Sequence, residues 1–329
     1  MKEIAFLISY PLITIIIIIL SNKFKFLDKV NKKKIHLRSV PNTLGLSIYF
    51  FLFLLVISYE LSFEIERIIA IGFFIVILGF VDDRTNLSPG VKITLKSIPI
   101  IFLILNDFNL DDLGEYEFIG KLYLGKFAFL FVFLGSLLLI NSFNYIDGID
   151  GLLLSLSATI IIYYIFLSNF SNDYVKLLLY FFYILIISLA LNLLSSSSKF
   201  KSFSGNSGSL FLGFFFSFLM IYLYKKQNIH PSYLIWGCWY PVYDFLYVTG
   251  KRILNMKNPS IRDNSHLHYR VLKIYKGNQI KTLICINFFN IVIILLGLFI
   301  ATNLGNIFSL AMFIILFIFF IFLRRNFIK

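Results

Sequence analysis

Two apolar runs enclose one polar segment: FAFLFVFLGSLLLI at 127–140, NSFNYIDGIDG at 141–151, and LLLSLSATIIIYYIFLS at 152–168. Each apolar run approaches the roughly 20 residues that a helix needs to cross the hydrocarbon core of a bilayer. Neither run alternates between apolar and polar residues, as the strands of a membrane barrel do. The stretch therefore predicts two membrane helices joined by a polar turn.

The rest of the chain has the same character. Of its 329 residues, 59% are hydrophobic and only 14% are charged. A soluble domain of this size could not bury so much apolar surface, and a disordered chain would not contain it. The net charge of +13 does not indicate a nucleic-acid partner when the background is this apolar. The sequence predicts an all-α, polytopic membrane protein, with residues 1–329 forming a single domain in the lipid bilayer.

Eleven apolar stretches qualify as transmembrane helices, and they lie at 4–20, 44–59, 67–81, 93–106, 127–141, 151–168, 175–194, 209–224, 232–248, 282–301 and 306–323. Alternate connections, together with the tail from Arg324 and with Lys96 at the nearer membrane face, hold 23 of the 30 Lys and Arg. Because Lys and Arg stay on the cytoplasmic side, we expect the N-terminus outside, the C-terminus cytoplasmic and the protein in the cell inner (plasma) membrane. The expected cytoplasmic loops are 21–43, 82–92, 142–150, 195–208 and 249–281.

The connection at 107–126 falls on the opposite side and carries five acidic residues. We expect it to be a solvated acidic loop, because charge runs are usually solvated.

Apart from those on the opposite side, the carboxylates gather at the predicted cytoplasmic face; they include Asp82, Asp83, Asp147, Asp150, Asp244 and Asp263. Charges within the spans are nearly absent. A transporter would place ionisable residues inside its spans, so the pattern favours an active site at the membrane surface. Asp82 and Asp83 end the third stretch, where the helix dipole disfavours them and they repel each other. Such a pair predicts a hard divalent cation such as Mg²⁺ or a phosphate-linked role, with a solvated helix end as the alternative.

The polar segment at 141–151 is the most specific signal in the chain. Asn141, Asn144, Asp147 and Asp150 recur every three residues, which puts them on one face of a helical turn. Four such groups would be costly to bury without partners. We therefore expect a functional segment rather than an ordinary polar turn.

Two further segments are weaker signals. The Gly-rich turn GNSGS at 205–209 opens a predicted helix, and its backbone amides could bind an anion, although a simple capping turn explains it equally well. His266 and His268 lie between Arg262 and Arg270, which predicts a cradle for a phosphate or diphosphate. A solvated basic loop is the alternative, and zinc is disfavoured because no third soft ligand lies nearby.

Taken in order, these segments resemble the polyprenyl-phosphate N-acetylhexosamine-1-phosphate transferase superfamily (glycosyltransferase 4 family). The segments that match its motifs are Asp28 to His36, Pro41 to Leu46, Asp82-Asp83, Lys92, Asn141 to Gly151, and His266-Leu-His268. Asp263, His266, His268 and Arg270 fit the branch of UDP-GlcNAc:undecaprenyl-phosphate GlcNAc-1-phosphate transferases, as does the spacing of Asn192, while Asn264 and Tyr269 depart from it. The signature of the phospho-N-acetylmuramoyl-pentapeptide transferase branch is absent.

The resemblance implies transfer of a sugar-1-phosphate, expected to be N-acetylhexosamine-1-phosphate, from a UDP-sugar such as UDP-GlcNAc to undecaprenyl phosphate. UMP would leave, and the lipid-linked product would begin a cell-envelope polysaccharide such as O-antigen. It implies Mg²⁺ as the cofactor, with Mn²⁺ as a substitute, and a homodimer. Direct attack by the lipid phosphate and a phospho-aspartyl intermediate are both open.

The resemblance also assigns roles to residues. The catalytic residues it implies are Asp82, Asp83 and Asp150, with Asp150 and Asn206 as metal ligands. The substrate-binding residues it implies are His36, Lys92, Asn141, Asn144, Asp147, Asn192, Arg262, Asp263, His266, His268 and Arg270.

One position departs from the family in a way that matters for activity. The family turn has Asp where this chain has Asn206, so the amide oxygen would bind a metal without contributing a negative charge. A weakened or inactive relative that binds lipid phosphate is therefore one alternative, and a transporter of an anionic lipid-linked sugar is another.

Overall fold

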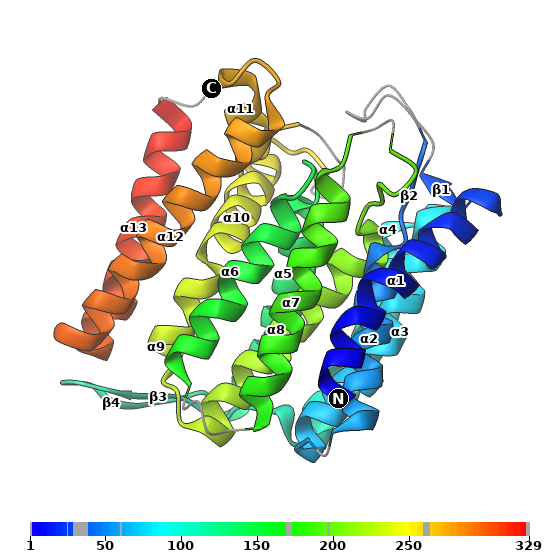
Figure 1. The fold of residues 1–329 in the computed structure, drawn as a ribbon. Coiled ribbons are helices and arrows are strands. Elements are labelled where there is room, and N and C mark those ends of the chain that lie inside the picture. Colours follow the sequence, from blue (N-terminus) through cyan, green and yellow to red (C-terminus); the bar gives the residue numbers. More distant parts are fainter. Residues whose placement is uncertain are drawn as a thin grey trace.

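The structure, a computed structural model, describes residues 2–24, 26–28, 39–59, 61–168, 173–195, 198–258 and 264–326. It is a bundle of helices with two short antiparallel sheets, and α1 begins at the end of the bundle opposite to the one where α13 ends (Figure 1). Three predicted site residues, His36, Arg262 and Asp263, lie outside the described residues.

The helices follow one another along the chain with short connections. Their bounds are α1 Lys2–Lys23, α2 Leu44–Ser58, α3 Phe63–Thr85, α4 Pro89–Leu103, α5 Ala128–Ile146, α6 Leu152–Leu167, α7 Asp173–Leu193, α8 Gly205–Gln227, α9 Pro231–Leu234, α10 Trp239–Leu254, α11 Leu267–Ile274, α12 Gln279–Asn303 and α13 Asn306–Asn326. Shorter helical turns are η1 Ile104–Phe108, η2 Gly125–Phe127 and η3 Ile235–Cys238, and the strands are β1 Leu27–Asp28, β2 Val40–Pro41, β3 Asp112–Tyr116 and β4 Gly120–Tyr123.

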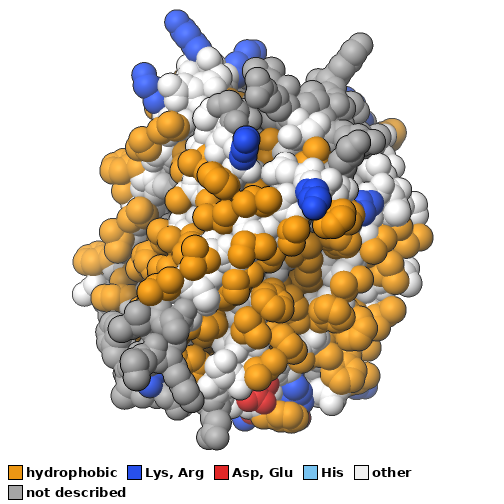
Figure 2. All heavy atoms as spheres, turned by 45° about the vertical axis from the view of Figure 1, so that its right-hand side comes forward, with side chains coloured by type: hydrophobic (Ala, Val, Ile, Leu, Met, Phe, Trp, Pro, Cys, Tyr) orange, Lys and Arg blue, Asp and Glu red, His pale blue; other side chains and the backbone are white. Residues whose placement is uncertain are grey.

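The apolar character of the helices confirms an all-α, multi-pass membrane protein. Six helices in the described part of the chain are long and apolar enough to cross a membrane. Hydrophobic side chains cover the middle of the face shown in Figure 2. Each of the eleven predicted stretches overlaps a helix, although 232–248 is divided among α9, η3 and α10. Eleven crossings and their orientation stay predictions.

Helix α8 occupies the centre of the bundle. It is buried along nearly its whole length and packs against α2, α3 and α5, whereas α13 is exposed along most of its sides. Two glycines let the neighbouring helices approach the start of α8. A Cβ at Gly45 would lie 2.2 Å from the backbone nitrogen of Gly208, and one at Gly79 would lie 2.4 Å from that of Ser207. This close approach brings the end of α3 to the first turn of α8.

The expectation of a solvated acidic loop at 107–126 is wrong for Asp112, which is buried, whereas Glu117 is exposed as expected but also makes specific contacts. The segment forms the hairpin β3–β4, in which Asp112 pairs with Lys121 at 3.0 Å and accepts a hydrogen bond from the Tyr224 hydroxyl. The Glu117 carboxylate accepts the backbone N–H groups of Asn306 (2.9 Å) and Ile307 (2.8 Å) at the start of α13. These carboxylates fasten the hairpin to the bundle because buried and helix-terminal N–H groups require acceptors.

Candidate active site

Asp82 lies in the last turns of α3 and is almost completely buried. Its Oδ1 is 2.8 Å from Nζ of Lys92 and accepts the backbone N–H of Leu87 at 3.0 Å. The chain makes this pair locally, because α3 ends at Thr85, Asn86 adopts a left-handed conformation and α4 begins at Pro89. Lys92 thus supplies the cation that a buried carboxylate at a helix C-terminus needs.

Asn206, in the first turn of α8, connects both carboxylates to the polar segment of α5. Its Nδ2 donates to Asp82 Oδ2 at 2.8 Å, and its backbone N–H donates to both oxygens of Asp83, at 3.0 and 3.2 Å. Its Oδ1 accepts from Nδ2 of Asn144 at 2.8 Å. We call Asp82, Asp83, Lys92, Asn144 and Asn206 the Asn206 network.

The predicted anion site at the start of α8 exists, but the protein fills it with its own side chain. The Asp83 carboxylate receives the backbone N–H of Asn206, where the helix dipole favours a negative charge. The apolar sequence of α8 and the Gly205 turn therefore position Asp83 as well as Asn206.

The expectation that the four polar residues of the motif share one helical face is wrong, because only the first part of the motif is helical. Helix α5 ends at Ile146, Asp147 follows directly, and Gly151 turns the chain with φ of +80°. Only Asn141 and Asn144 therefore lie on the helix. Asn144 binds α8, whereas Asn141 accepts a hydrogen bond at 2.7 Å from Lys96 of α4.

The end of the motif has partners of its own. Asp150 pairs with Lys201 at 2.5 Å. The Asn192 side chain accepts the backbone N–H of Gly151 (2.5 Å) and donates to the Ser202 carbonyl (2.9 Å). Lys96 and Lys201 are buried site residues that the sequence reading missed. The one signal for Lys96 was a lysine inside an apolar stretch.

The histidines gather around Asp244 of α10. The Asp244 Oδ2 lies 2.8 Å from Nδ1 of His266, and its Oδ1 lies 3.5 Å from Nη1 of Arg324, in the last turn of α13. We call Asp244, His266, His268 and Arg324 the Asp244 cluster. The sequence reading noted Asp244 only as a carboxylate at the predicted cytoplasmic face and counted Arg324 only as a topology signal.

The Asp244 cluster packs against the motif of α5. The His266 ring stacks on Tyr145 with 5.0 Å between centroids, and it stacks on His268 at 5.6 Å. A Cβ at Gly148 would lie 2.5 Å from the Tyr269 hydroxyl and 2.6 Å from Nε2 of His268, so this contact requires glycine. Burial lowers the pKa of His268 to about 3, and the ring is therefore neutral at physiological pH. Arg270 lies on α11 and is partly exposed.

The donors around Asn206 fit a hard cation. Carboxylate oxygens of Asp82 and Asp83 and amide oxygens of Asn144 and Asn206 are the ligand type that Mg²⁺ takes. No group of three His, Cys, Asp or Glu suited to a metal occurs among the described residues. Asp150 lies against Lys201, so its predicted pairing with Asn206 as a metal ligand stays a prediction.

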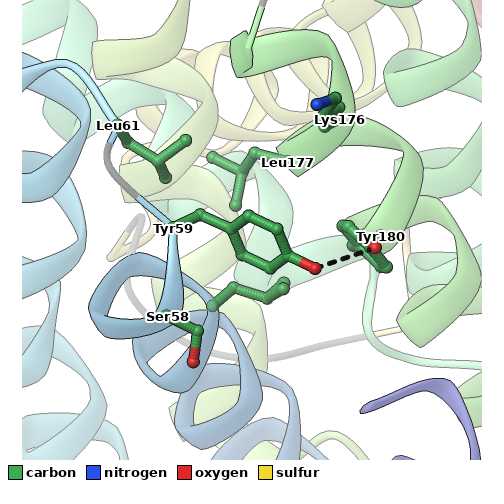
Figure 3. A pocket seen from close by; sticks show the side chains of 7 residues that line it. Ser58, Tyr59, Leu61, Lys176, Leu177 and Tyr180 are labelled. Atoms are coloured by element: carbon green, nitrogen blue, oxygen red, sulfur yellow. Dashed lines mark hydrogen bonds between the residues drawn. The ribbon is translucent and has the colours of Figure 1, made fainter. Parts of the chain in front are cut away.

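A cavity of about 310 Å³ lies away from these residues, between α2 and α7 (Figure 3). Its lining includes Lys176, and the hydroxyls of Tyr59 and Tyr180 lie 3.1 Å apart in it. Tyr59 directly follows α2, near the start of α3, whereas Asp82 lies near the end of α3. The cavity contains no predicted site residue and is separate from the site.

Comparisons with known proteins agree with the motifs. Residues 66–224 match the family model "Glycosyl transferase family 4". Over 301 residues, covering 85% of this chain and 80% of the relative, the chain is 29% identical to a Bacillus subtilis protein named "Probable undecaprenyl-phosphate N-acetylglucosaminyl 1-phosphate transferase".

Two enterobacterial relatives have similar names. The chain is 24% identical to an "Undecaprenyl-phosphate alpha-N-acetylglucosaminyl 1-phosphate transferase" of Escherichia coli K12 (77% of this chain, 71% of the relative) and 27% identical to that of Salmonella typhi (81% and 76%). The resemblance read from the motifs is thereby confirmed: residues 66–224 match glycosyl transferase family 4, and across most of its length this chain is similar to proteins named as undecaprenyl-phosphate N-acetylglucosaminyl 1-phosphate transferases.

Proposed function

We propose that this protein transfers N-acetylhexosamine-1-phosphate from a UDP-sugar to undecaprenyl phosphate or a similar polyprenyl phosphate. The observation that carries the proposal is the Asn206 network, in which two carboxylates, a lysine and two amides from α3, α4, α5 and α8 meet at one end of a membrane bundle. The names of the relatives support the same reaction class. The product would begin a cell-envelope polysaccharide.

In the proposed reaction, a phosphate oxygen of the lipid attacks the β-phosphorus of the UDP-sugar. The bond from that phosphorus to the bridging oxygen breaks, and UMP leaves with the electron pair. Both reactants are anions, so their repulsion must be offset. Lys92 supplies one cationic group, and Arg270 on α11 supplies another.

Mg²⁺, held by Asp82, Asp83 and the amide oxygen of Asn206, would supply Lewis-acid stabilisation of the diphosphate when bound. Mn²⁺ takes the same ligands. The carboxylates would also orient the lipid phosphate or accept its proton. Both oxygens of Asp82 and of Asp83 already accept hydrogen bonds or an ion pair, which supports direct attack over a phospho-aspartyl intermediate.

The test is release of radiolabelled UMP by purified protein supplied with undecaprenyl phosphate, Mg²⁺ and a panel of UDP-sugars, with mass detection of the lipid product. We expect UMP release with a UDP-N-acetylhexosamine and none without the lipid. If a thermal unfolding transition shows that the protein is folded, absence of UMP release with every UDP-sugar would contradict the proposal.

We further propose that the site faces the cytoplasm, with the N-terminus outside, across the plasma membrane. The chain has two cysteines, of which Cys238 is buried and Cys285 is partly buried, so a single introduced cysteine can report sidedness once Cys285 is replaced by serine. An impermeant maleimide applied to intact cells should label Phe118→Cys at the tip of the hairpin and spare Lys257→Cys after α10. If only Lys257→Cys were labelled, the protein would have the opposite orientation in the membrane.

One contact favours a second candidate, a weakened or inactive relative that binds lipid phosphate. Because Asn206 Nδ2 donates to Asp82 and Lys92 pairs with it, this carboxylate has its partners without a metal ion. UMP release by Asn206→Asp and none by the natural chain would establish this alternative.

A further inference from the structure

Asp244 is fully buried, and both of its oxygens hold the histidine segment. Oδ2 accepts from Nδ1 of His266 at 2.8 Å, and Oδ1 accepts the backbone N–H of Leu267 at 2.9 Å. One carboxylate therefore fixes both the imidazole and the backbone at the start of α11. A buried carboxylate is strongly unfavourable unless it is paired in this way.

Arg324, near the C-terminal end of the chain, contacts both Asp244 and the histidine segment. Its Nη2 donates to the Ser265 carbonyl at 2.6 Å, its Nη1 is 3.5 Å from Asp244, and its guanidinium lies over the Tyr247 ring at 4.8 Å. Arg324 is only 3% exposed, whereas the neighbouring Arg325 is exposed. Of two adjacent arginines in one helical turn, only Arg324 is built into the histidine segment.

His266 has one ring nitrogen left for a ligand. Nδ1 faces Asp244, so Nε2 lies on the opposite side of the ring, and it has no hydrogen-bond partner among the described residues. The side chain is 3% exposed and stacks on Tyr145 of the α5 motif. Because buried polar atoms almost always have partners, this nitrogen indicates a bound group.

We propose that Asp244 and Arg324 are positioning residues that fix the tautomer and the orientation of His266, so that its Nε2 binds a phosphate oxygen of a substrate. This inference rests on the proposed function for the identity of the ligand. Asp244 accepts the Nδ1 hydrogen, and a protonated His266 then donates from Nε2 to the phosphate. Arg324 balances the charge of Asp244 and holds Ser265, and neither residue touches the substrate.

Histidine nitrogen spectra of the full chain test the positioning directly. The chain contains four histidines, so ¹⁵N imidazole resonances can be assigned by removing one histidine at a time. We expect His266 to carry its hydrogen on Nδ1 in the natural chain and to lose this preference in Asp244→Asn. Arg324→Gln should shift the His266 resonances, and the matched control Arg325→Gln should leave them unchanged.

If Asp244→Asn fails to fold, the Arg324→Gln and Arg325→Gln pair decides the question. Unchanged His266 resonances in Asp244→Asn, or equal shifts in the two arginine variants, would overturn the proposal.

Adding each ligand separately identifies the phosphate. A shift of the Nε2 resonance on addition of UDP-GlcNAc alone assigns the diphosphate of the nucleotide sugar, whereas a shift with undecaprenyl phosphate in detergent micelles alone assigns the lipid phosphate. A resonance that responds to neither ligand would overturn the ligand part of the proposal.

Kinetics provide the second readout. We expect kcat/KM for UMP release to fall about 10- to 100-fold in Asp244→Asn, as for other groups that orient a liganding histidine, with the increase in KM confined to the ligand that shifts Nε2. Arg325→Gln should keep the natural rate. Full activity in Asp244→Asn would overturn the proposal. If the natural chain releases no UMP, the proposed function fails, and the ¹⁵N spectra still decide the positioning.

Discussion

The Asn206 network and the Asp244 cluster meet through α5, yet they balance charge differently. Asn144 binds the first and its neighbour Tyr145 stacks on the second. The five residues of the Asn206 network comprise two carboxylates, one lysine and two neutral amides. The Asp244 cluster balances one carboxylate with Arg324 and an imidazole that can take a proton.

The difference suggests a division of roles between two adjoining halves of one site. Carboxylate and amide oxygens together are the ligands that a hard cation takes. Where a carboxylate is already paired with an arginine, a further positive group can bind an anion. The Asn206 network is thus suited to Mg²⁺ and the Asp244 cluster to substrate phosphate. Four substitutions would break or sharpen this contrast.

The largest effect is expected from Asp82→Asn. Removing this charge leaves Lys92 without its carboxylate and weakens cation binding, and we expect UMP release to fall about 10³-fold, within the range for loss of a catalytic acid–base group. Glu64→Gln is the matched control, because Glu64 pairs with Lys226 at 2.7 Å at the opposite end of the same helix. Equal losses in the two variants would show that the effect is structural.

Asn206→Asp should sharpen the contrast by adding a negative charge to the network. Without a divalent cation the new carboxylate faces Asp82, so we expect thermal unfolding in EDTA to show a loss of about 1–3 kcal/mol. Mg²⁺ should restore this stability, with an affinity about tenfold higher than that of the natural chain, because a carboxylate binds Mg²⁺ better than an amide. Asn278→Asp, at the exposed N-cap of α12, is the control. If Mg²⁺ does not change the thermal stability of Asn206→Asp, the result would contradict a cation site at Asn206.

Gly148→Ala should separate the two halves. The new Cβ would lie 2.6 Å from Nε2 of His268, so the histidine segment must move, at a cost of about 1–3 kcal/mol for an overpacked site. We expect a higher KM in the UMP assay. Gly135→Ala, also on α5, meets nothing within 4 Å and should keep the natural KM. The same KM in both variants would contradict close packing at Gly148.

The smallest effect concerns the buried ring of His268, which is surrounded by Asp244, His266 and Arg324. Burial lowers its folded pKa to about 3 from 6.5, so the unfolded chain binds more protons between these values. The free energy of unfolding should therefore fall as the pH drops below 6.5, by about 1.4 kcal/mol per unit, and this contribution should be constant above it. Thermal unfolding in detergent at pH 5 and 7.5 should show a smaller difference for His268→Gln. Identical pH dependence in both proteins would contradict a neutral, buried His268.

The sequence predicted the all-α membrane architecture and named each member of the Asn206 network as a candidate, but it did not predict the contacts of Asn206 with Asp82, Asp83 and Asn144. Apolar runs determine helices in a bilayer almost alone, since every backbone group must be paired within its segment. Asp82, Asp83 and Asn206 stand in recognisable motifs. The role of Arg324 could not be predicted from the sequence, because basic residues after a last span are ordinary topology signals. Its contact with Asp244 forms only when α13 packs beside α10.

The spacing of the polar residues in the α5 motif gave a wrong prediction of a shared helical face, because the helix ends within the motif. A three-residue repeat implies one face only while the helix continues, and the glycines at 148 and 151 end that regularity. The partners of Asp150 and Asn192 come from the connection before α8, where the sequence has no periodicity to read. The acidic hairpin was missed because charge composition alone does not reveal hydrogen bonds to a distant helix such as α13.

Helix α13 is held at both termini, by Glu117 at its first residues and through Arg324 in its last turn. Its 21 residues extend over about 30 Å, close to the thickness of the hydrocarbon core. A membrane helix with free ends adapts to a thicker or thinner bilayer by changing its tilt. With both ends fixed, a tilt of α13 would pull on Asp244, so the thickness of the surrounding lipid becomes a variable that acts on the histidine segment.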